Sequence, residues 1–319
     1  MSRSPGHDVL VLGEVLVELS TSGALHDGAG LRLGFSGDAL NAAAAAAAAG
    51  ARTALLARVA DDELGDALLA RVVALGVDTA LVRRVPGQQG VYVVCADPSG
   101  RREFVYVRRG SAGSTLCPED VAAAGLEHVG VVVGSGVTAA LSASAAAALQ
   151  EAARQAPRFV YDPNFRPRLT SSEAAAQVLA QVARRAELIT PACPGETVPL
   201  LGTADPIEAA RRALRLGAAA VAVTLGAEGV LLHEDSGEPV HVPSLPPPSV
   251  IDQTGAGDSL VGTVAARLAL GDDLPTAVRL GCAAASLCLQ GQGGTGFVPT
   301  LAQVRSHLDA HQLSPRGAA

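Results

Sequence analysis

The chain has 319 residues, of which 49% are hydrophobic and only 3% aromatic, so its core must be built mainly from Ala, Val and Leu. Its net charge of −7 argues against nucleic acid as a main partner. The sequence contains no lysine, which excludes pyridoxal-phosphate enzymes, Schiff-base aldolases and P-loop nucleotide triphosphatases, because each of these needs a lysine amine. Any bound anion must therefore be held by arginine, backbone N–H groups or a metal ion.

No stretch approaches the roughly 18 uninterrupted apolar residues of a membrane-spanning helix, and residues 1–8 lead directly into a strand-like segment. We therefore expect neither a membrane span nor a signal peptide, and a cytoplasmic location. The five cysteines lie far apart without CxxC spacing, which favours reduced thiols and argues against a zinc site.

Short Val-rich segments alternate with segments rich in Ala, Leu and Arg along most of the chain. The former predict β-strands and the latter α-helices. Because the strand segments are too apolar to leave one face exposed to water, they predict an α/β fold with a mostly parallel sheet covered by helices on both faces. The predicted strands are 9–12, 53–59, 129–133, 158–162, 187–190, 219–224 and 230–233, and the predicted helices are 41–49, 63–75, 141–155, 173–185 and 207–216, with a mainly helical region from 259 to 307.

Two segments, at about 14–35 and 90–109, instead alternate apolar with polar residues. The sequence DPSG at 97–100 is a strong hairpin turn within the second segment. Antiparallel ribbon inserted twice into a parallel frame favours a small second sheet that serves as a lid, and an ordinary edge hairpin is the simpler alternative. We predict a single domain over residues 1–319 that carries the lid as insertions.

The segment DQTGAGD, residues 252–258, precedes the last helical region. Gly255, Ala256 and Gly257 permit a bend whose backbone N–H groups can point together at an anion near a helix N-terminus. A carboxylate at Asp258 can accept the proton of an attacking hydroxyl while such amides stabilise a phosphoryl group in transfer. A capped helix with an acidic first turn is the simpler alternative, and spacing alone leaves both open.

The segment DQTGAGDSLVG resembles the C-terminal signature of the ribokinase-like (PfkB-type) carbohydrate kinases, and GFSGDALNAAAAAAAAGA, at 34–51, resembles their N-terminal signature. The two lie about two hundred residues apart, in the order and at the distance typical of that family. The resemblance implies an αβα sandwich with a small β-sheet lid and ATP- and Mg²⁺-dependent phosphorylation of a sugar hydroxyl, and it leaves a monovalent cation open. Asp258 would be the general base, and Gly255, Ala256 and Gly257 the anion hole.

The segment VTLGAEGVLL, residues 223–232, corresponds to the part of the family that contacts ATP. The resemblance therefore implies nucleotide-binding roles for Thr224, Gly226 and Gly229. A β-hairpin with glycine turns is the simpler alternative for this segment.

The segment PACPGE, residues 191–196, resembles the N-x-x-E element of the family. Glu196 would order the water shell of Mg²⁺, which keeps several of its waters when bound. Cys193 stands at the asparagine position, and because a thiol lacks the paired donor and acceptor of an amide, its direct contact with phosphate is in doubt.

The segments RRGSAGS, from Arg108, and YDPNFR, ending at Arg166, resemble the 2-keto-3-deoxygluconate kinase branch. A planar guanidinium matches a carboxylate with two parallel hydrogen bonds, so Arg108 and Arg166 could clamp an acidic sugar. Glu18 stands near a family aspartate that touches the sugar, and its longer side chain leaves that contact open. The resemblance assigns further substrate contacts to Gly37, Asn41, Tyr92, Tyr106 and Asp252, and an ATP contact to Asn164.

These signatures together predict a kinase that phosphorylates 2-dehydro-3-deoxygluconate on its 6-hydroxyl. A fructokinase- or ribokinase-like kinase of a neutral sugar remains the alternative, because D-P-N-x-R also occurs in such members. A non-catalytic sugar- or nucleotide-binding regulator is a second alternative, which the intact Asp258 disfavours. A nicotinamide dehydrogenase is disfavoured because no G-x-G-x-x-G follows the first strand. The resemblance also implies a homodimer formed through the lid.

Overall fold

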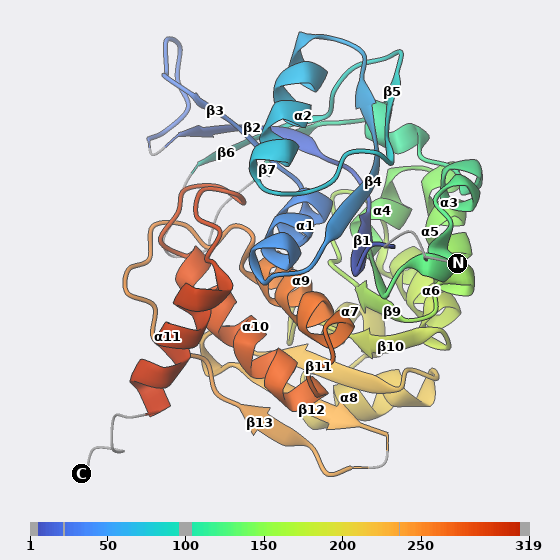
Figure 1. Cartoon of the computed structure of the whole chain (residues 1–319), viewed down its shortest axis with the longest axis vertical. Coiled ribbons are helices and arrows are strands. Elements are labelled where there is room, and N and C mark those ends of the chain that lie inside the picture. Colours follow the sequence, from blue (N-terminus) through green and yellow to red (C-terminus); the bar gives the residue numbers. More distant parts are fainter. Residues whose placement is uncertain (1–5, 22, 96–103, 236, 313–319) are drawn as a thin grey trace.

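The computed structural model describes residues 6–21, 23–95, 104–235 and 237–312. Two sheets organise this part of the chain, a nine-stranded sheet in the order β13-β12-β11-β10-β9-β8-β1-β4-β5 and a four-stranded sheet in the order β3-β2-β6-β7 (Figure 1). The strands of the large sheet are β1 (Val9–Leu12), β4 (Thr53–Ala60), β5 (Val82–Val85), β8 (Val131–Ser135), β9 (Phe159–Asp162), β10 (Ala186–Ile189), β11 (Ala220–Thr224), β12 (Val230–Glu234) and β13 (Val240–Val242).

The large sheet is parallel from β11 to β5, and only β12 and β13 are antiparallel to their neighbours. The carboxyl ends of the parallel strands therefore meet at one edge, where open α/β sheets bind their ligands. The mostly parallel sheet is as predicted. Two of its strands, β5 and β13, were not predicted, because they are short edge strands with several exposed residues and lack the apolar pattern of the others.

Helices cover both faces of the large sheet. Alternate strand residues divide between two cores, so that Val9 and Val11 pack with one helix layer and Leu10 and Leu12 with the other. The first layer contains α1 (Asp38–Ala48), α2 (Glu63–Ala74), α9 (Ala256–Ala269) and α10 (Leu274–Cys288), with α11 (Leu301–Gln312) packed on α10. The second contains α3 (Pro118–Ala123), α4 (Gly136–Leu141), α5 (Ala143–Gln155), α6 (Ser172–Ala183), α7 (Thr197–Leu201) and α8 (Pro206–Arg215), and the short 3₁₀ helices are η1 (Ala112–Thr115), η2 (Leu126–His128) and η3 (Gly226–Glu228).

The run of alanines in α1 lets that helix pack very closely on α9. A Cβ added at Gly262 would lie 2.0 Å from the carbonyl oxygen of Ala42, so the two backbones touch where a side chain would separate them. Small residues thus bring the first turn of α1 beside the first turn of α9, which positions the candidate site.

The small sheet combines both ribbon segments, with β2 (Leu16–Thr21) and β3 (Arg32–Ser36) from the first and β6 (Val91–Cys95) and β7 (Phe104–Val107) from the second. The two ribbons join through parallel pairing of β2 with β6, so the predicted small second sheet is confirmed. The predicted turn at 97–100 lies outside the described residues.

Two predicted helices begin elsewhere than the sequence pattern indicated. The helix predicted over 141–155 is divided into α4 and α5 by Ser142, whose extended backbone breaks the helix and whose hydroxyl accepts the N–H of Ala145. Helix α1 begins at Asp38 rather than Asn41, directly after Gly37 with φ of 115°. A positive φ ends the preceding strand, and it is a conformation that glycine adopts without strain.

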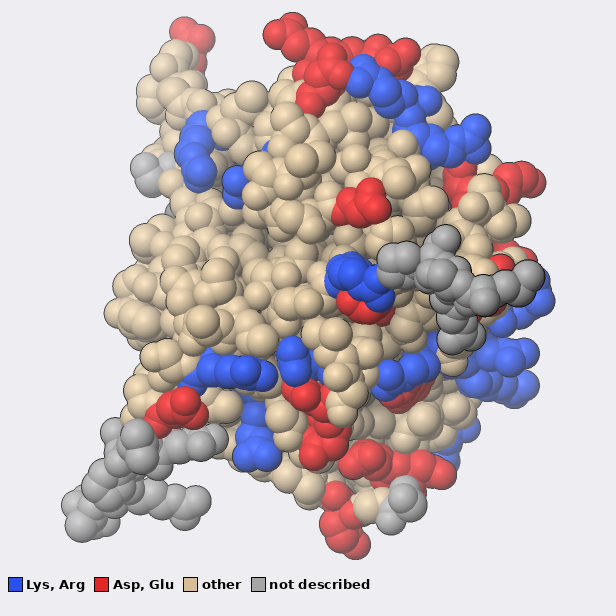
Figure 2. Space-filling view, viewed as in Figure 1, with Lys and Arg blue, Asp and Glu red and all other residues tan. Residues whose placement is uncertain are grey.

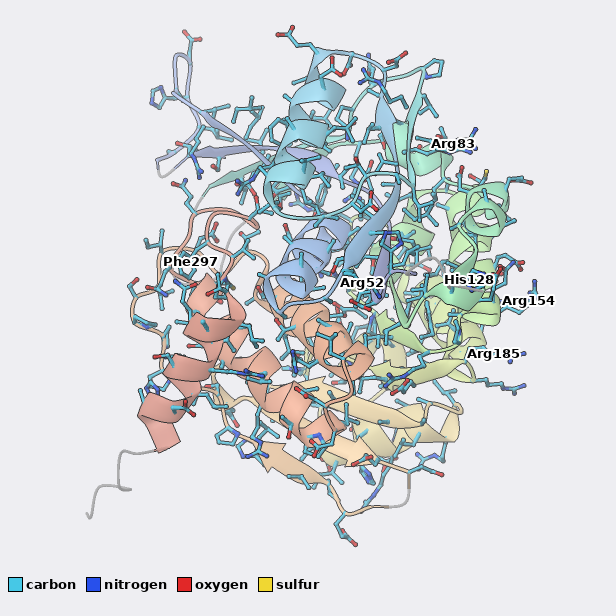
Figure 3. All side chains as sticks on the ribbon, in the orientation of Figure 1. Arg52, Arg83, His128, Arg154, Arg185 and Phe297 are labelled. Atoms are coloured by element: carbon cyan, nitrogen blue, oxygen red, sulfur yellow. The ribbon has the colours of Figure 1, made fainter. Side chains whose placement is uncertain are left out.

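The surface carries charges of both signs. On the face seen in Figure 2, arginines lie next to acidic side chains, and Arg154 and Arg185 project outward (Figure 3). None of the helices in the described part of the chain is both long enough and apolar enough to cross a membrane.

Candidate active site

A cleft of about 100 Å³ lies between the small sheet and the carboxyl edge of the large one. Helices α1 and α9 contribute their first turns, β6 and β7 contribute two tyrosines, and the loop after β9 contributes polar side chains. Nine of the residues predicted for the site line this cleft, although they come from five separate segments: Gly37, Asn41, Tyr92, Tyr106, Arg108, Asn164, Arg166, Gly255 and Asp258.

Asp258 lies in the first turn of α9 and faces the cleft. Asn41 Nδ2 donates to one carboxylate oxygen at 2.8 Å and Asn164 Nδ2 to the other at 3.4 Å. Asn41 is itself oriented by Ser36, whose hydroxyl donates to its Oδ1 at 3.1 Å. The carboxylate is therefore held by amides from two distant segments, which a helix cap alone does not require.

The electrostatic surroundings of Asp258 favour its protonated form. Burial, followed by the negative charge of Asp38, raises its pKa to about 7, although the two amide hydrogen bonds and the Arg166 guanidinium act in the opposite direction. A carboxylate that titrates near neutral pH can both accept and hold a proton, as a general base requires.

The backbone before α9 forms the predicted bend. Gly255 is the N-cap with φ of 82°, and a Cβ there would lie 2.9 Å from the carbonyl oxygen of Gly294, so this position requires glycine. The N–H of Ala256 makes only a long contact, 3.4 Å, with the Gln253 carbonyl. Gly257 is exposed, with open space where a side chain would be. The bend thus leaves room for an anion at the start of the helix.

Asp252 is placed differently from its predicted role. It is fully buried and is absent from the cleft lining among the described residues. Its Oδ1 accepts the N–H of Thr254 at 3.0 Å and the hydroxyl at 2.8 Å, while Oδ2 accepts the N–H of Gly293 at 2.9 Å. Contrary to the expected substrate contact, this buried carboxylate stabilises the bend by connecting Thr254 to Gly293. Sequence position could not reveal this, because its partner Gly293 is 41 residues away.

Arg108 lines the cleft but also has a carboxylate partner in the protein. It is 8% exposed, forms an ion pair with Glu14, and lies over the Tyr106 ring at 5.4 Å. Glu14 is fully buried and also accepts from the Ser111 hydroxyl, and burial raises its pKa despite the charge of Arg108. Within the described residues, Arg108 Nε has no hydrogen-bond acceptor.

Arg166, which lines the cleft, lies near Glu196. Arg166 Nη1 is 4.0 Å from Glu196 Oε1, and the Arg166 side chain is 43% exposed. Glu196 accepts the N–H of Phe165 at 2.6 Å and of Ala192 at 2.9 Å, so it ties the loop after β9 to the loop after β10. Asp162 has a pKa well above its ordinary value because it is buried and lies near the negative charges of Glu196 and Asp258.

The residues predicted to bind nucleotide follow β11, next to the loop that carries Glu196. Thr224 ends the strand, and its carbonyl accepts the N–H of Cys193 at 2.9 Å. Gly226 and Gly229 have φ of 61° and 103°, which favours glycine at both positions. The Cys193 thiol donates to the carbonyl of Ala204 at 3.3 Å, and hence is engaged with protein.

The comparison with known proteins decides the family. A family model described as pfkB family carbohydrate kinase matches residues 7–301. The chain belongs to the pfkB family of carbohydrate kinases. It is 34% identical to the 2-dehydro-3-deoxygluconokinase of Thermoproteus tenax over 308 residues, which are 95% of this chain and 94% of that protein.

Solved structures agree with this fold. The PfkB protein of a Polaromonas species is 28% identical with a TM-score of 0.81, covering 94% of this chain and 99% of that one. The fructokinase of Xylella fastidiosa, solved with bound ATP, has a TM-score of 0.83 at 22% identity, covering 96% and 99%. The predicted family and the ribokinase-like αβα fold are confirmed, and as a pfkB carbohydrate kinase the protein is a phosphotransferase that acts on a sugar hydroxyl.

Three acidic residues of this pfkB kinase site were not predicted from the sequence. Asp38 lines the cleft and accepts from the Ser135 hydroxyl, Asp162 lies beneath Asn164, and Glu14 pairs with Arg108. Asp38 and Asp162 stand inside the quoted GFSGDALN and YDPNFR segments, and their positions, directly after Gly37 and two residues before Asn164, were a usable signal. Glu14 had no comparable signal, because its role depends on a residue 94 positions away.

Proposed function

We propose that the protein transfers the γ-phosphoryl group of ATP to the 6-hydroxyl of 2-dehydro-3-deoxygluconate. The observation that carries the proposal is the carboxylate of Asp258, which is held by Asn41 and Asn164 at the open N-terminus of α9. The choice of substrate draws on the identity to the Thermoproteus tenax 2-dehydro-3-deoxygluconokinase. ATP as donor is supported by the fructokinase of the same fold that was solved with it.

In this proposal Asp258 accepts the proton of the attacking hydroxyl. Its two amide partners aim the carboxylate into the cleft, and a pKa of about 7 lets it take the proton near neutral pH. The backbone amides of Gly255, Ala256 and Gly257 then stabilise the charge on the transferring phosphoryl group, since that charge develops where they point.

Glu196 fits an indirect role toward Mg²⁺. Each of its two oxygens accepts one backbone N–H group. A second lone pair on each oxygen remains available for a water of the ion's shell. When bound with ATP, the ion supplies charge neutralisation across the phosphates. Thr224, Gly226 and Gly229 would form the nucleotide side of the site, beside the Glu196 loop.

Arg108 supports an acidic rather than a neutral acceptor. Its guanidinium is buried, and its Nε, which has no acceptor among the residues that the structure describes, is a donor that a substrate carboxylate would satisfy. Tyr106 under the guanidinium and Tyr92 on the neighbouring strand would contact the sugar, together with Arg166, which lines the same cleft. The neutral-sugar alternative is favoured by Glu14, which already balances the charge of Arg108.

We further propose that residues 1–319 act as one kinase domain, that the small sheet is its lid, and that two lids pair in a homodimer. One face of the small sheet faces the cleft through Tyr92 and Tyr106. The opposite face carries exposed apolar side chains, Leu33 at 52%, Val105 at 47% and Val107 at 62%, which a second copy would cover. Light scattering of the purified protein tests the dimer, and a monomer would contradict it.

The proposed reaction is tested by ADP release with a panel of sugar acids and neutral sugars. We expect turnover of 2-dehydro-3-deoxygluconate to exceed that of fructose and ribose, and to fall by ~10²–10⁴ in Asp258→Asn, the usual range for losing general-base assistance. Arg108→Ala should raise KM for the sugar acid alone, while Arg109→Ala, at the exposed neighbouring position, is the matched control. Preference for a neutral hexose that Arg108→Ala does not alter would reject the acid-binding role.

A further inference from the structure

Glu18 lies in β2 on the same face of the small sheet as its neighbour Tyr92, but it is not among the described residues that line the cleft. It is 3% exposed and stands opposite Gly34 on one side and Tyr92 on the other. Its side chain borders a separate hollow of about 190 Å³, which the 292–296 segment closes together with Arg71. Glu18 is therefore a buried carboxylate that the reaction proposed above leaves without a role.

The carboxylate of Glu18 joins the small sheet to the turn at Gly293 and Gly294. Its Oε2 accepts both the Tyr92 hydroxyl, within the small sheet, and the N–H of Gly294 at 3.2 Å. A Cβ at Gly293 would lie 1.9 Å from Glu18 Oε1, so the turn packs directly on the carboxylate. One oxygen atom thus connects the small sheet to a turn that lies 276 residues further along the chain, and we call this pair of hydrogen bonds the joint.

The same turn packs on the groups that position Asp258. A Cβ at Gly294 would lie 2.4 Å from Asn41 Nδ2 and 2.3 Å from Ser36 Oγ, and Asn41 Nδ2 is the donor that holds Asp258. The carbonyl oxygen of Gly294 also lies against Gly255, the N-cap of α9. The turn is therefore in contact with the small sheet, the Asn41 donor and the bend before the catalytic helix.

We propose that Glu18 is a positioning residue. Acting through Gly293 and Gly294, it fixes the position of the small sheet, which faces the sugar, relative to the base and the anion hole. This inference goes beyond the proposed substrate and rests on Asp258 as the base. A charge-assisted hydrogen bond inside a buried joint is stiffer than a neutral contact, and the longer glutamate side chain spans the distance to the turn. Because phosphoryl transfer depends on alignment to within a fraction of an ångström, a loosened joint slows the chemical step more than it weakens binding.

The inference is tested with three variants of β2. Glu18→Ala removes the joint, Glu18→Gln keeps the length and one acceptor oxygen, and Ser20→Ala is the matched control, since Ser20 is 1% exposed on the same face and its hydroxyl has no partner within the described residues. Steady-state kinetics uses whichever sugar of the panel is turned over. We expect kcat to fall about 10- to 100-fold in Glu18→Ala, with KM for both substrates within about threefold and most of kcat recovered in Glu18→Gln.

A pH profile separates positioning from a purely structural role. The hydrogen bond from Asn41 lowers the pKa of Asp258. Loss of the joint frees Asn41 and weakens this hydrogen bond, so the pKa of Asp258 should rise in Glu18→Ala. The acidic limb of the kcat profile should then move to higher pH. Asp38, Arg166 and Asp162 are the other charged groups around Asp258, and the substitution at Glu18 leaves their side chains unaltered. Gly294→Ala, which pushes on Asn41 directly, should shift the same limb.

Two results would overturn the inference. A rise in KM for the sugar with kcat retained, and Glu18→Gln as impaired as Glu18→Ala, would show that Glu18 contacts the sugar instead. An unchanged acidic limb together with unchanged hydrogen exchange at 16–21 and 291–296 would show that no joint exists. Failure of the base assignment is distinguishable, because it appears as retained turnover in Asp258→Asn, while the exchange result for Glu18→Ala does not depend on it.

Discussion

Replacing Asp258 by asparagine should stabilise the protein at alkaline pH while it removes activity. The native environment raises the pKa of this carboxyl from 3.8 to about 7, chiefly by burial. A folded-state pKa above the unfolded one means that the native state binds more protons between about pH 4 and pH 7. Stability therefore falls as pH rises through that window, and the full penalty of the ionised carboxylate remains above it.

The size of the effect follows from the shift. Three units correspond to an upper limit of ~4 kcal/mol at pH 8. Partial exposure of Asp258 reduces this figure. An asparagine would also direct an NH₂ group at Asn41 or Asn164, both of which donate to the present carboxylate, and that mismatch costs about 1–3 kcal/mol. The net gain should be about 2 kcal/mol at pH 8, or about 3 °C in Tm, and at pH 4 the variant should be no more stable than the parent.

The measurement is the thermal midpoint of parent and variant from pH 4 to pH 8, with Asp309→Asn, exposed on α11, as the control. The Tm difference for Asp258→Asn should rise with pH and level off above pH 7, and the control difference should stay flat. A difference that is negative or independent of pH across the range would refute the reasoning, because it would mean that Asp258 is not desolvated in the native protein.

Three further predictions follow from the same geometry. The kcat of the parent should decline below pH ~7, as Asp258 becomes protonated, and a profile flat to pH 5 would place the base elsewhere. Asp120→Asn should lower the free energy of unfolding by ~3 kcal/mol and leave KM unchanged, because Asp120 is 2% exposed and accepts from Arg58 at 2.7 Å and Arg83 at 2.9 Å. Chemical denaturation with parallel kinetics checks this, and equal stability would contradict it. Gly262→Ala should lower the free energy of unfolding by ~1–3 kcal/mol and also reduce kcat, since a methyl group there forces α9 away from α1 and Asn41 away from Asp258. A stable and fully active variant would contradict the close packing of those helices.

Much of the fold could be predicted from the order of elements in the sequence. Strand β1 is wholly apolar and β4 and β11 are mostly so, which is a local property that burial on both faces requires. The polar short strands β5 and β13 lacked that property and were missed. The break at Ser142 was also missed, because a serine serves equally as a helix residue and as the N-cap of a new helix, and neighbouring helices decide between them.

For the candidate site, the sequence alone was enough to identify Asp258, Asn41 and the turn at Gly255, because they belong to glycine bends and family signatures. Such motifs are contiguous, so the order of residues alone carries their chemistry. Only the tertiary structure decided what each side chain contacts: Asp252 supports the bend from behind, Glu14 pairs with Arg108, and Glu18 reaches Gly294. The physical reason is that a buried carboxylate needs a donor wherever the fold places one, and these donors come from segments brought together only when the two sheets pack.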